Sequence, residues 1–134
     1  MHNPDWPETL FTQSPPGLGN QFDDDPLLGS WLRRMLPATI VAELRGELRE
    51  LGALAGGDLY RLQQADLANE PVLTQWDPWG RRLDQVVVSP LWREAERLAA
   101  KHGLVATGYE PAFGRYARMA QFLKVYLFHP SSDV

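Results

Sequence analysis

Hydrophobic and polar residues follow one another along most of the chain with the period of a helix. Apolar side chains between residues 27 and 36 have i, i+1, i+4, i+5 spacing, which gathers them on one helical face. Asp25-Pro26 precedes this run: Asp can cap the free amides of a first turn, and Pro has the backbone angle that a first turn needs. The pattern predicts a short amphipathic helix that starts at Asp25 and ends at Leu36, before Pro37.

Two further helices are predicted from the same kind of pattern. Pro37 starts the first of them, and Gly52 and the Gly56-Gly57 pair are expected to end it. Asp58 can cap the next helix, which carries apolar residues at three-residue steps to about Asn69. We therefore expect two successive helices with glycine between them.

The pattern changes between Pro71 and Val88. Val72–Trp76 and Leu83–Val88 flank Asp77-Pro78-Trp79-Gly80, in which Asp, Pro and Gly stand where a type I turn favours them. Neither flank alternates cleanly between apolar and polar residues. A small hairpin and an ordered loop are both open for this segment.

Two more helices complete the pattern. Ser89-Pro90 repeats the cap signal and Gly103 is the expected left-handed stop, which predicts a helix between them. The last helix is expected from about Ala112 to Phe128, and its polar residues recur every third position, at Arg115, Arg118, Gln121 and Lys124. Three residues turn a helix by about 300°, so this stripe drifts by about 60° per step. Such a helix has no proper solvent face, and other protein surfaces should cover it.

The first residues of the chain differ from the rest. Five of the 11 prolines lie within the first 26 residues, together with Gly17 and Gly19, so this stretch cannot form a regular helix or a central strand. We predict an extended arm over residues 1–24 and a helical domain over residues 25–134. Whether the arm packs against other protein or stays solvated is open, because it carries the apolar residues Trp6, Leu10, Phe11, Leu18 and Phe22.

Composition limits the chemistry. A length of 134 residues suits one domain, and the absence of cysteine excludes disulfides, thiolate metal sites and cysteine nucleophiles. His2, His102 and His129 are far apart in the sequence, which predicts no metal site. No phosphate-binding glycine loop and no nucleophile elbow occurs. We therefore predict no catalytic and no cofactor-binding residue in this chain.

Charge is uneven along the chain. Residues 1–30 carry five acidic residues and no Lys or Arg, whereas the rest balances 13 basic residues against 12 acidic ones. This distribution gives no general attraction for nucleic acid or for anionic lipid, so neither is expected as a partner of this segment. Because no basic or apolar leader opens the sequence, we also predict a soluble, cytoplasmic protein.

Two charged clusters have competing interpretations. Asp23-Asp24-Asp25 could serve in acid and base chemistry, but three acids before a helix are more often a solvated cap. Arg81-Arg82, near Trp76 and Trp79, could clamp a phosphate or a nucleotide. The favoured interpretation is structural, with the arginines stacking on the tryptophans and pairing with Asp77 or Asp84.

Several segments together resemble a known family. They are Gly19-Asn20-Gln21-Phe22, Asp25-Pro26-Leu27-Leu28, Leu67 to Leu73, Trp76 to Val86 and Pro90-Leu91-Trp92. Their order and spacing are similar to the N-terminal helical domain of the AidB-like branch of flavin-dependent acyl-CoA dehydrogenases. The segment from Trp76 resembles the Asp-aromatic-Gly-Asn/Arg-Arg-Ile/Leu-Asp signature of that branch. The chain departs from the family at Ser89 and Arg93, where the family often has His.

The resemblance implies a mainly α fold: an acyl-CoA dehydrogenase N-terminal-like domain of about five helices with a small hairpin or ordered loop and an extended N-terminal arm. In the full-length family a flavin-binding β-domain and a C-terminal helical bundle follow, FAD lies between them, and the enzyme is usually a tetramer. Those parts are absent from this chain. We expect a truncated product or fragment that binds no cofactor and is inactive alone.

The resemblance also implies a role for the last helix. In this family the N-terminal domain walls the acyl pocket and supports the flavin domain and the oligomer. The residues expected to form that wall are Tyr116, Met119, Phe122, Leu123 and Tyr126, with ordinary core packing as the alternative for each. The alternative for the whole chain is a stand-alone protein-interaction or oligomerisation module without enzymatic activity.

Overall fold

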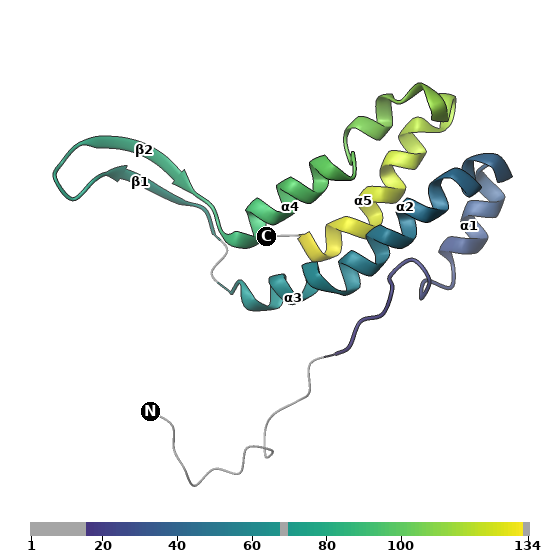
Figure 1. The fold of residues 1–134 in the computed structure, drawn as a ribbon, viewed down its shortest axis with the longest axis horizontal. Helices are drawn as coiled ribbons and strands as arrows, with labels where there is room; N and C mark the ends of the chain where they lie inside the picture. Colours follow the sequence, from purple (N-terminus) through teal and green to yellow (C-terminus); the bar gives the residue numbers. More distant parts are fainter. Residues whose placement is uncertain (1–15, 68–69, 133–134) are drawn as a thin grey trace, which may run out of the picture.

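The computed structural model describes residues 16–67 and 70–132 and shows a mainly helical domain with one antiparallel hairpin (Figure 1). Its elements in chain order are α1 (Leu28–Met35), α2 (Ala38–Gly56), α3 (Asp58–Ala65), β1 (Val72–Trp76), β2 (Arg82–Val87), α4 (Pro90–Lys101), the 3-10 helices η1 (Ala106–Tyr109) and η2 (Pro111–Tyr116), and α5 (Ala117–Ser132). No helix in these ranges reaches the combined length and apolar content that crossing a bilayer demands.

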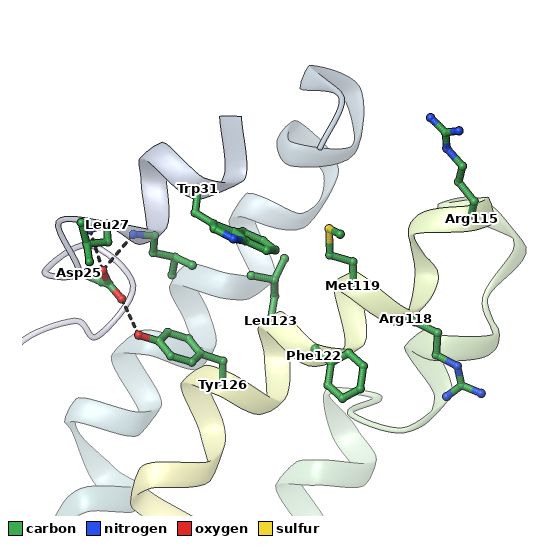
Figure 2. Close-up of a pocket in the computed structure, with 10 residues that line it drawn as sticks. Asp25, Leu27, Trp31, Arg115, Arg118, Met119, Phe122, Leu123 and Tyr126 are labelled. Carbon is green, nitrogen blue, oxygen red and sulfur yellow. Dashed lines mark hydrogen bonds between the residues drawn. The ribbon is translucent and has the colours of Figure 1, made fainter. Parts of the chain in front are cut away.

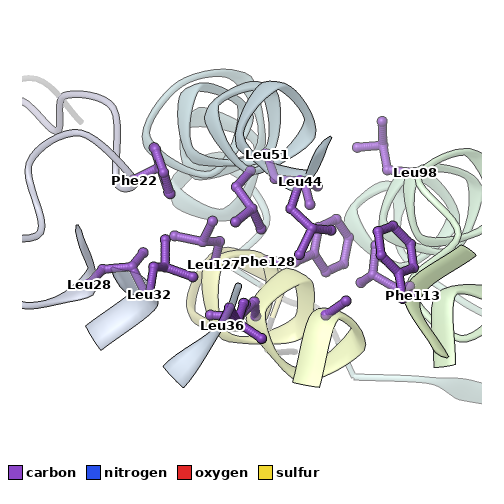
Figure 3. Packing of buried hydrophobic residues seen from close by; sticks show 14 of the residues in the cluster. Phe22, Leu28, Leu32, Leu36, Leu44, Leu51, Leu98, Phe113, Leu127 and Phe128 are labelled. Atoms are coloured by element: carbon purple, nitrogen blue, oxygen red, sulfur yellow. The ribbon is translucent and has the colours of Figure 1, made fainter. Parts of the chain in front are cut away.

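The hydrophobic core lies where α2 packs against α5. Leu44, Leu48 and Leu51 of α2 are fully buried, and they share the core with Leu127 and Phe128 of α5 (Figure 3). Burying each such leucine stabilises the fold by about 1.5–3 kcal/mol relative to leaving it in water. The pair α2 and α5 therefore forms the scaffold on which α1, α3, α4 and the 3-10 helices are placed.

Local capping signals place two of the helix starts. The Asp25 Oδ1 atom accepts hydrogen bonds from the backbone N–H groups of Leu27 (2.8 Å) and Leu28 (2.9 Å), so α1 itself begins at Leu28. Ser89 Oγ accepts from the N–H of Trp92 at 3.3 Å, and α4 begins at Pro90 as predicted. Gly103 follows α4 with a φ of +61°, the left-handed conformation expected of a stop.

The expected role of Gly52 is wrong, because α2 continues through it to Gly56. The segment before α1 crosses the helix at this point: the Gln21 N–H donates to the Gly52 carbonyl at 3.0 Å, and Phe22 is buried in the core. A Cβ at residue 52 would lie 2.5 Å from the backbone N of Phe22. Glycine is therefore needed here for close approach rather than for helix termination.

Helix α3 ends at Ala65, earlier than the predicted end near Asn69, which itself lies outside the described residues. Asp66 leaves the helix and its Oδ2 accepts a hydrogen bond from the N–H of Leu91 at 2.9 Å. This carboxylate supplies a partner for a free amide in the first turn of α4. The residue that follows α3 thus contacts a residue 25 positions further along the chain.

The predicted start of the last helix near Ala112 is also wrong. Gly114 has a φ of +49° inside η2, which interrupts the helical path, and α5 begins at Ala117.

The polar residues of α5 do not all face water. Lys124 is only 3% exposed, and its ammonium donates to Thr107 Oγ1 (2.8 Å) and the His102 carbonyl (3.0 Å) and pairs with Glu47 Oε2 (2.6 Å).

Of the two alternatives left open between Pro71 and Val88, the hairpin is the one that forms. The Asp77 Oδ1 atom accepts from the N–H groups of Trp79 (2.9 Å) and Arg81 (2.8 Å), and Gly80 has a φ of +84°. The two strands project away from the helices (Figure 1).

Of the predicted arm over residues 1–24, residues 1–15 lie outside the described part of the chain, including Trp6, Leu10 and Phe11. Residues 16–20 have no helix or strand, and residues 21–24 form a turn. The Asn20 side chain donates to the Arg49 carbonyl at 3.0 Å, and Asp23 pairs with Arg49 at 2.8 Å. These contacts tie the end of the arm to α2.

Candidate functional site

A cavity of about 640 Å³ lies between the start of α1 and one face of α5. Its lining is predominantly apolar and comes from two short stretches of chain. Leu27, Leu28 and Trp31 form one side, and Met119, Phe122, Leu123 and Tyr126 form the other (Figure 2). Figure 2 shows the Trp31 ring beside Met119 and Leu123, so the two sides face each other at short range. The arrangement offers a mostly apolar cavity of the size that small-molecule sites have.

The cavity face of α5 is unusually apolar for an exposed helix surface. Phe122 is 68% exposed and Tyr126 is 57% exposed, although both are large hydrophobic side chains. Leu123 is buried, and Met119 packs partly buried against the core. Residues 119, 122, 123 and 126 share a face because helical neighbours recur at three and four residues. The exposed part of this face is available for a ligand or for another protein surface.

Four of the five residues predicted to form a pocket wall line this cavity, namely Met119, Phe122, Leu123 and Tyr126. Tyr116 does not line it: the residue precedes α5 and packs against the core, and its hydroxyl accepts a hydrogen bond from Arg115 Nη2 at 2.6 Å. Sequence reasoning missed the opposite side, formed by Leu27, Leu28 and Trp31. The signal was present in the amphipathic pattern of residues 27–36, in which Leu28 and Leu32 enter the core while Leu27 and Trp31 are exposed.

One hydrogen bond joins the two sides of the cavity. The Tyr126 hydroxyl donates to Asp25 Oδ2 at 2.8 Å, while the other carboxylate oxygen of Asp25 caps the turn before α1. The Tyr126 hydrogen bond, followed by those of Leu28 and Leu27, holds the pKa of Asp25 below its ordinary value, although partial burial opposes the shift. The same bond to the carboxylate, with burial, raises the pKa of Tyr126. Asp25 is therefore an ionised acceptor at neutral pH.

Two arginines stand at the rim of the cavity. Arg118 lies over the Tyr109 ring, with 4.4 Å from Cζ to the ring centroid, and its Nη1 donates to Gln121 Oε1 at 2.9 Å. Arg115 lies over the Tyr116 ring at 4.8 Å. Both guanidinium groups point away from the apolar lining (Figure 2). The interior of the cavity is therefore left to apolar contacts.

The other candidate clusters have structural partners. Arg82 stacks on the Trp76 ring at 5.8 Å and pairs with Asp84 at 2.5 Å, as the structural interpretation expects of this arginine. Burial lowers the pKa of His102, Lys101 and Lys124 add to this shift, and the carboxylates of Glu50 and Glu47 oppose it. Within residues 16–67 and 70–132, acidic and histidine side chains form no group of three or more that could hold a metal ion. His2 lies outside these residues.

Comparison with known protein families identifies the family of this chain. The sequence model of the "Adaptive response protein AidB N-terminal domain" family matches residues 13–132. The chain belongs to this AidB N-terminal domain family. Acyl-CoA dehydrogenase family member 11 of Caenorhabditis elegans is 33% identical to it over 126 residues, which are 92% of this chain and 20% of that protein.

Two solved structures share the fold of this AidB N-terminal domain. One is the apo form of Bd2924, with a TM-score of 0.83 and 38% identity over 91% of this chain and 24% of that one. The other is Caenorhabditis elegans ACDH-11 in complex with C11-CoA, with a TM-score of 0.83 and 29% identity over 96% of this chain and 22% of that one. The AidB N-terminal domain thus spans between a fifth and a quarter of the relatives it matches, and its neighbours are acyl-CoA dehydrogenase N-terminal domains.

Acyl-CoA dehydrogenases imply FAD in the longer proteins, and the chemistry of the cavity lining indicates whether this group would fit here. The pyrophosphate of a dinucleotide is commonly bound by backbone amides at a helix N-terminus or by cationic side chains. In the cavity the Asp25 carboxylate is anionic, and Arg118 is engaged with Tyr109 and Gln121. This lining does not fit FAD and suits a flexible apolar chain better.

Proposed function

We propose that this domain is part of an AidB-like, flavin-dependent acyl-CoA dehydrogenase and that its α1–α5 cavity forms one wall of the acyl pocket. The observation that carries the proposal is the apolar cavity between Trp31 and the exposed face of α5. The match to an acyl-CoA dehydrogenase family member and the fold shared with a C11-CoA complex support it. In this proposal the flavin and the reacting groups belong to other domains, and assembly into a homo-oligomer completes the enzyme.

The proposed wall acts by removing the acyl chain from water. Each methylene buried against Trp31, Met119, Phe122 or Leu123 contributes about 0.8 kcal/mol, or roughly a fourfold gain in affinity. Tyr126 has a different part, because its hydroxyl is held by Asp25 and its ring closes the edge of the cavity. Tyr116 would support α5 from the core side. The wall therefore selects chain length by shape and area rather than by hydrogen bonding.

The proposal is tested in a chimera. The 126 matching residues of the Caenorhabditis elegans protein are replaced by those of this chain, and kcat/KM is measured for a series of saturated acyl-CoAs around C11. Met119→Trp, which fills the cavity, should lower kcat/KM for C11-CoA relative to shorter substrates by at least about tenfold, because about two methylenes lose their contacts. Met35→Trp, the same substitution at an exposed site of α1 outside the cavity lining, should leave the profile unchanged.

Two results would contradict the proposal. One is a flavin-loaded chimera whose chain-length profile is the same with and without Met119→Trp. The other is flavin bound to the isolated chain. We expect this chain to purify without the absorbance of oxidised flavin at about 450 nm, because its cavity does not suit FAD. Stoichiometric flavin in the isolated chain would place the cofactor site in this domain.

A further inference from the structure

A second cavity, of about 410 Å³, lies next to the α1–α5 cavity. Asp25 and Tyr126 line both cavities, so these two residues stand at the boundary between them. The helix α5 runs along both cavities: Leu123 lines the α1–α5 cavity, and Pro130 lines the second one. The two cavities therefore follow one another along the same helix, with Tyr126 between them.

A hydrogen bond crosses this boundary from α5 to the turn before α1. Figure 2 shows the Tyr126 ring reaching towards Asp25, where its hydroxyl donates to Oδ2 at 2.8 Å. The acceptor is an ionised carboxylate at neutral pH, and hydrogen bonds to charged acceptors are stronger than neutral ones. Asp25 is held in place because its Oδ1 accepts from the N–H groups of Leu27 and Leu28. Tyr126 is the end of this bridge that can move, since it is 57% exposed.

The second cavity differs from the first in its chemistry. Its lining mixes apolar with hydrogen-bonding side chains, among them Leu18, Leu127, Gln21, Asp24, Tyr60 and Gln63. Removing a hydroxyl group from water is costly unless it finds a hydrogen-bond partner. Amide, carboxylate and phenol groups supply such partners, which the apolar lining of the α1–α5 cavity does not offer. The second cavity therefore suits the end of a long chain, above all a chain that ends in a hydroxyl group.

We propose that Tyr126 is a specificity-determining residue for chain length: held by Asp25, it stops an acyl chain at the end of the α1–α5 cavity, and when it moves aside a longer chain continues into the second cavity. This inference rests on the proposed function, because it needs an acyl chain in the α1–α5 cavity. A hydrogen bond to a charged group favours the closed position by about tenfold. Short chains do not meet this cost, whereas long chains bind only the open form and meet it in full.

The first test follows the chain end in the isolated protein. Backbone amide shifts are recorded by NMR while decanoyl-CoA or tetradecanoyl-CoA is added, each below its micelle concentration. Both ligands should shift the amides of Met119 and Leu123 in the α1–α5 cavity. In Tyr126→Ala, tetradecanoyl-CoA should also shift the amide of Gln63 in the second cavity. The same shift should be at least about fivefold smaller in the parent chain, and decanoyl-CoA should not produce it in either protein.

The second test measures chain-length preference in the flavin-loaded chimera. Tyr126→Ala should raise kcat/KM for tetradecanoyl-CoA relative to decanoyl-CoA by at least about tenfold, because each additional buried methylene contributes roughly fourfold. The gain should lie in KM rather than in kcat, since the chain end is remote from the reacting bond. Tyr126→Phe keeps the ring and loses the hydrogen bond, so its gain should be smaller. Trp79→Ala, at an exposed aromatic residue outside both linings, should leave the ratio unchanged.

Two further comparisons show whether the second cavity holds the added length of chain. Gln63→Trp narrows this cavity, so it should abolish the gain of Tyr126→Ala for tetradecanoyl-CoA and leave decanoyl-CoA unchanged. Tetradecanoyl-CoA with a hydroxyl on its terminal carbon should serve Tyr126→Ala at least as well as tetradecanoyl-CoA itself, because the polar side chains of the lining supply partners for the hydroxyl.

The outcomes separate this inference from the proposed function. If neither ligand shifts the amides of Met119 and Leu123, the isolated chain holds no acyl group and this inference falls, while Met119→Trp in the chimera still decides the proposed function. If those amides respond but Tyr126→Ala changes neither the Gln63 shift nor the chain-length ratio, this inference alone is overturned.

The second cavity has its own contradicting results. A gain that survives Gln63→Trp, or a loss of tenfold or more on adding the terminal hydroxyl, would show that the chain end lies elsewhere and would overturn the inference. A shift at Gln63, together with a gain in KM that Gln63→Trp abolishes, supports it.

Discussion

Replacing Gly52 by alanine should destabilise the domain although alanine is the better helix former. The new methyl group would lie 2.5 Å from the backbone N and 2.7 Å from the Cβ of Phe22, and neither atom can move without shifting the turn. The displaced turn loses the Gln21 N–H to Gly52 carbonyl bond, worth about 1 kcal/mol, and much of the 1.5–3 kcal/mol from burial of Phe22. Helix propensity returns roughly 1 kcal/mol. The net loss is about 2 kcal/mol.

Gly46 supplies the matched control for this prediction. It lies in the same helix, is exposed, and a Cβ there meets nothing within 4 Å. Gly46→Ala should therefore stabilise the domain by about 0.5–1 kcal/mol. Urea unfolding followed by far-UV circular dichroism measures both variants against the parent. If Gly52→Ala proves as stable as the parent while Gly46→Ala is stabilised, the turn at residues 20–22 does not pack on α2 as described.

Two further predictions concern polar groups inside or beside the bundle. Lys124→Met leaves the His102 carbonyl and the Thr107 hydroxyl without their donor, so it should lower the free energy of unfolding in urea by about 2 kcal/mol. Lys101→Met, at an exposed ion pair, should change this free energy by less than about 0.5 kcal/mol. Equal losses in the two variants would contradict the buried network around Lys124. Tyr126→Phe should raise the pKa of Asp25 in an NMR titration towards its ordinary value, because the hydroxyl bond is the main cause of the lowered pKa. The folded-state pKa of Asp25 is depressed, so its ionised form stabilises the fold above its unfolded-state pKa and loses this effect as pH falls through the folded-state pKa. The variant should therefore lose this contribution at a higher pH on acidification, and an unchanged Asp25 titration would refute the assignment.

Features set by neighbouring residues could be predicted from the sequence. The capping residues Asp25 and Ser89, the left-handed Gly103 and the turn at Asp77 to Gly80 all act within four residues, so their chemistry is visible in the chain itself. These signals predicted the start and end of α4 and the position of the hairpin turn, whereas α1 begins at Leu28, later than the start predicted at Asp25. The apolar face of α5 was predicted as a pocket wall from the family resemblance, and the structure places four of its five residues at one cavity.

Features that depend on contacts between distant residues could not be predicted in this way. Gly52 had the local character of a helix stop, and only the crossing of residues 20–22 shows that it serves a close approach. The hydrogen bond of Asp66, just after α3, to the first turn of α4 joins residues that are 25 positions apart. Lys124 looked like part of a drifting polar stripe, although three partners from α2, η1 and the end of α4 hold it inside the bundle. The α1 side of the cavity likewise depends on tertiary packing.

The central claim is that the α1–α5 cavity holds an acyl chain. The most direct measurement is photolabelling of the flavin-loaded chimera with an acyl-CoA that carries a diazirine at the end of a chain comparable to C11, followed by peptide mass spectrometry. We expect adducts on Trp31, Met119, Phe122 or Leu123, and competition by unlabelled C11-CoA should remove them. Adducts confined to residues outside the cavity, equally well competed, would contradict it.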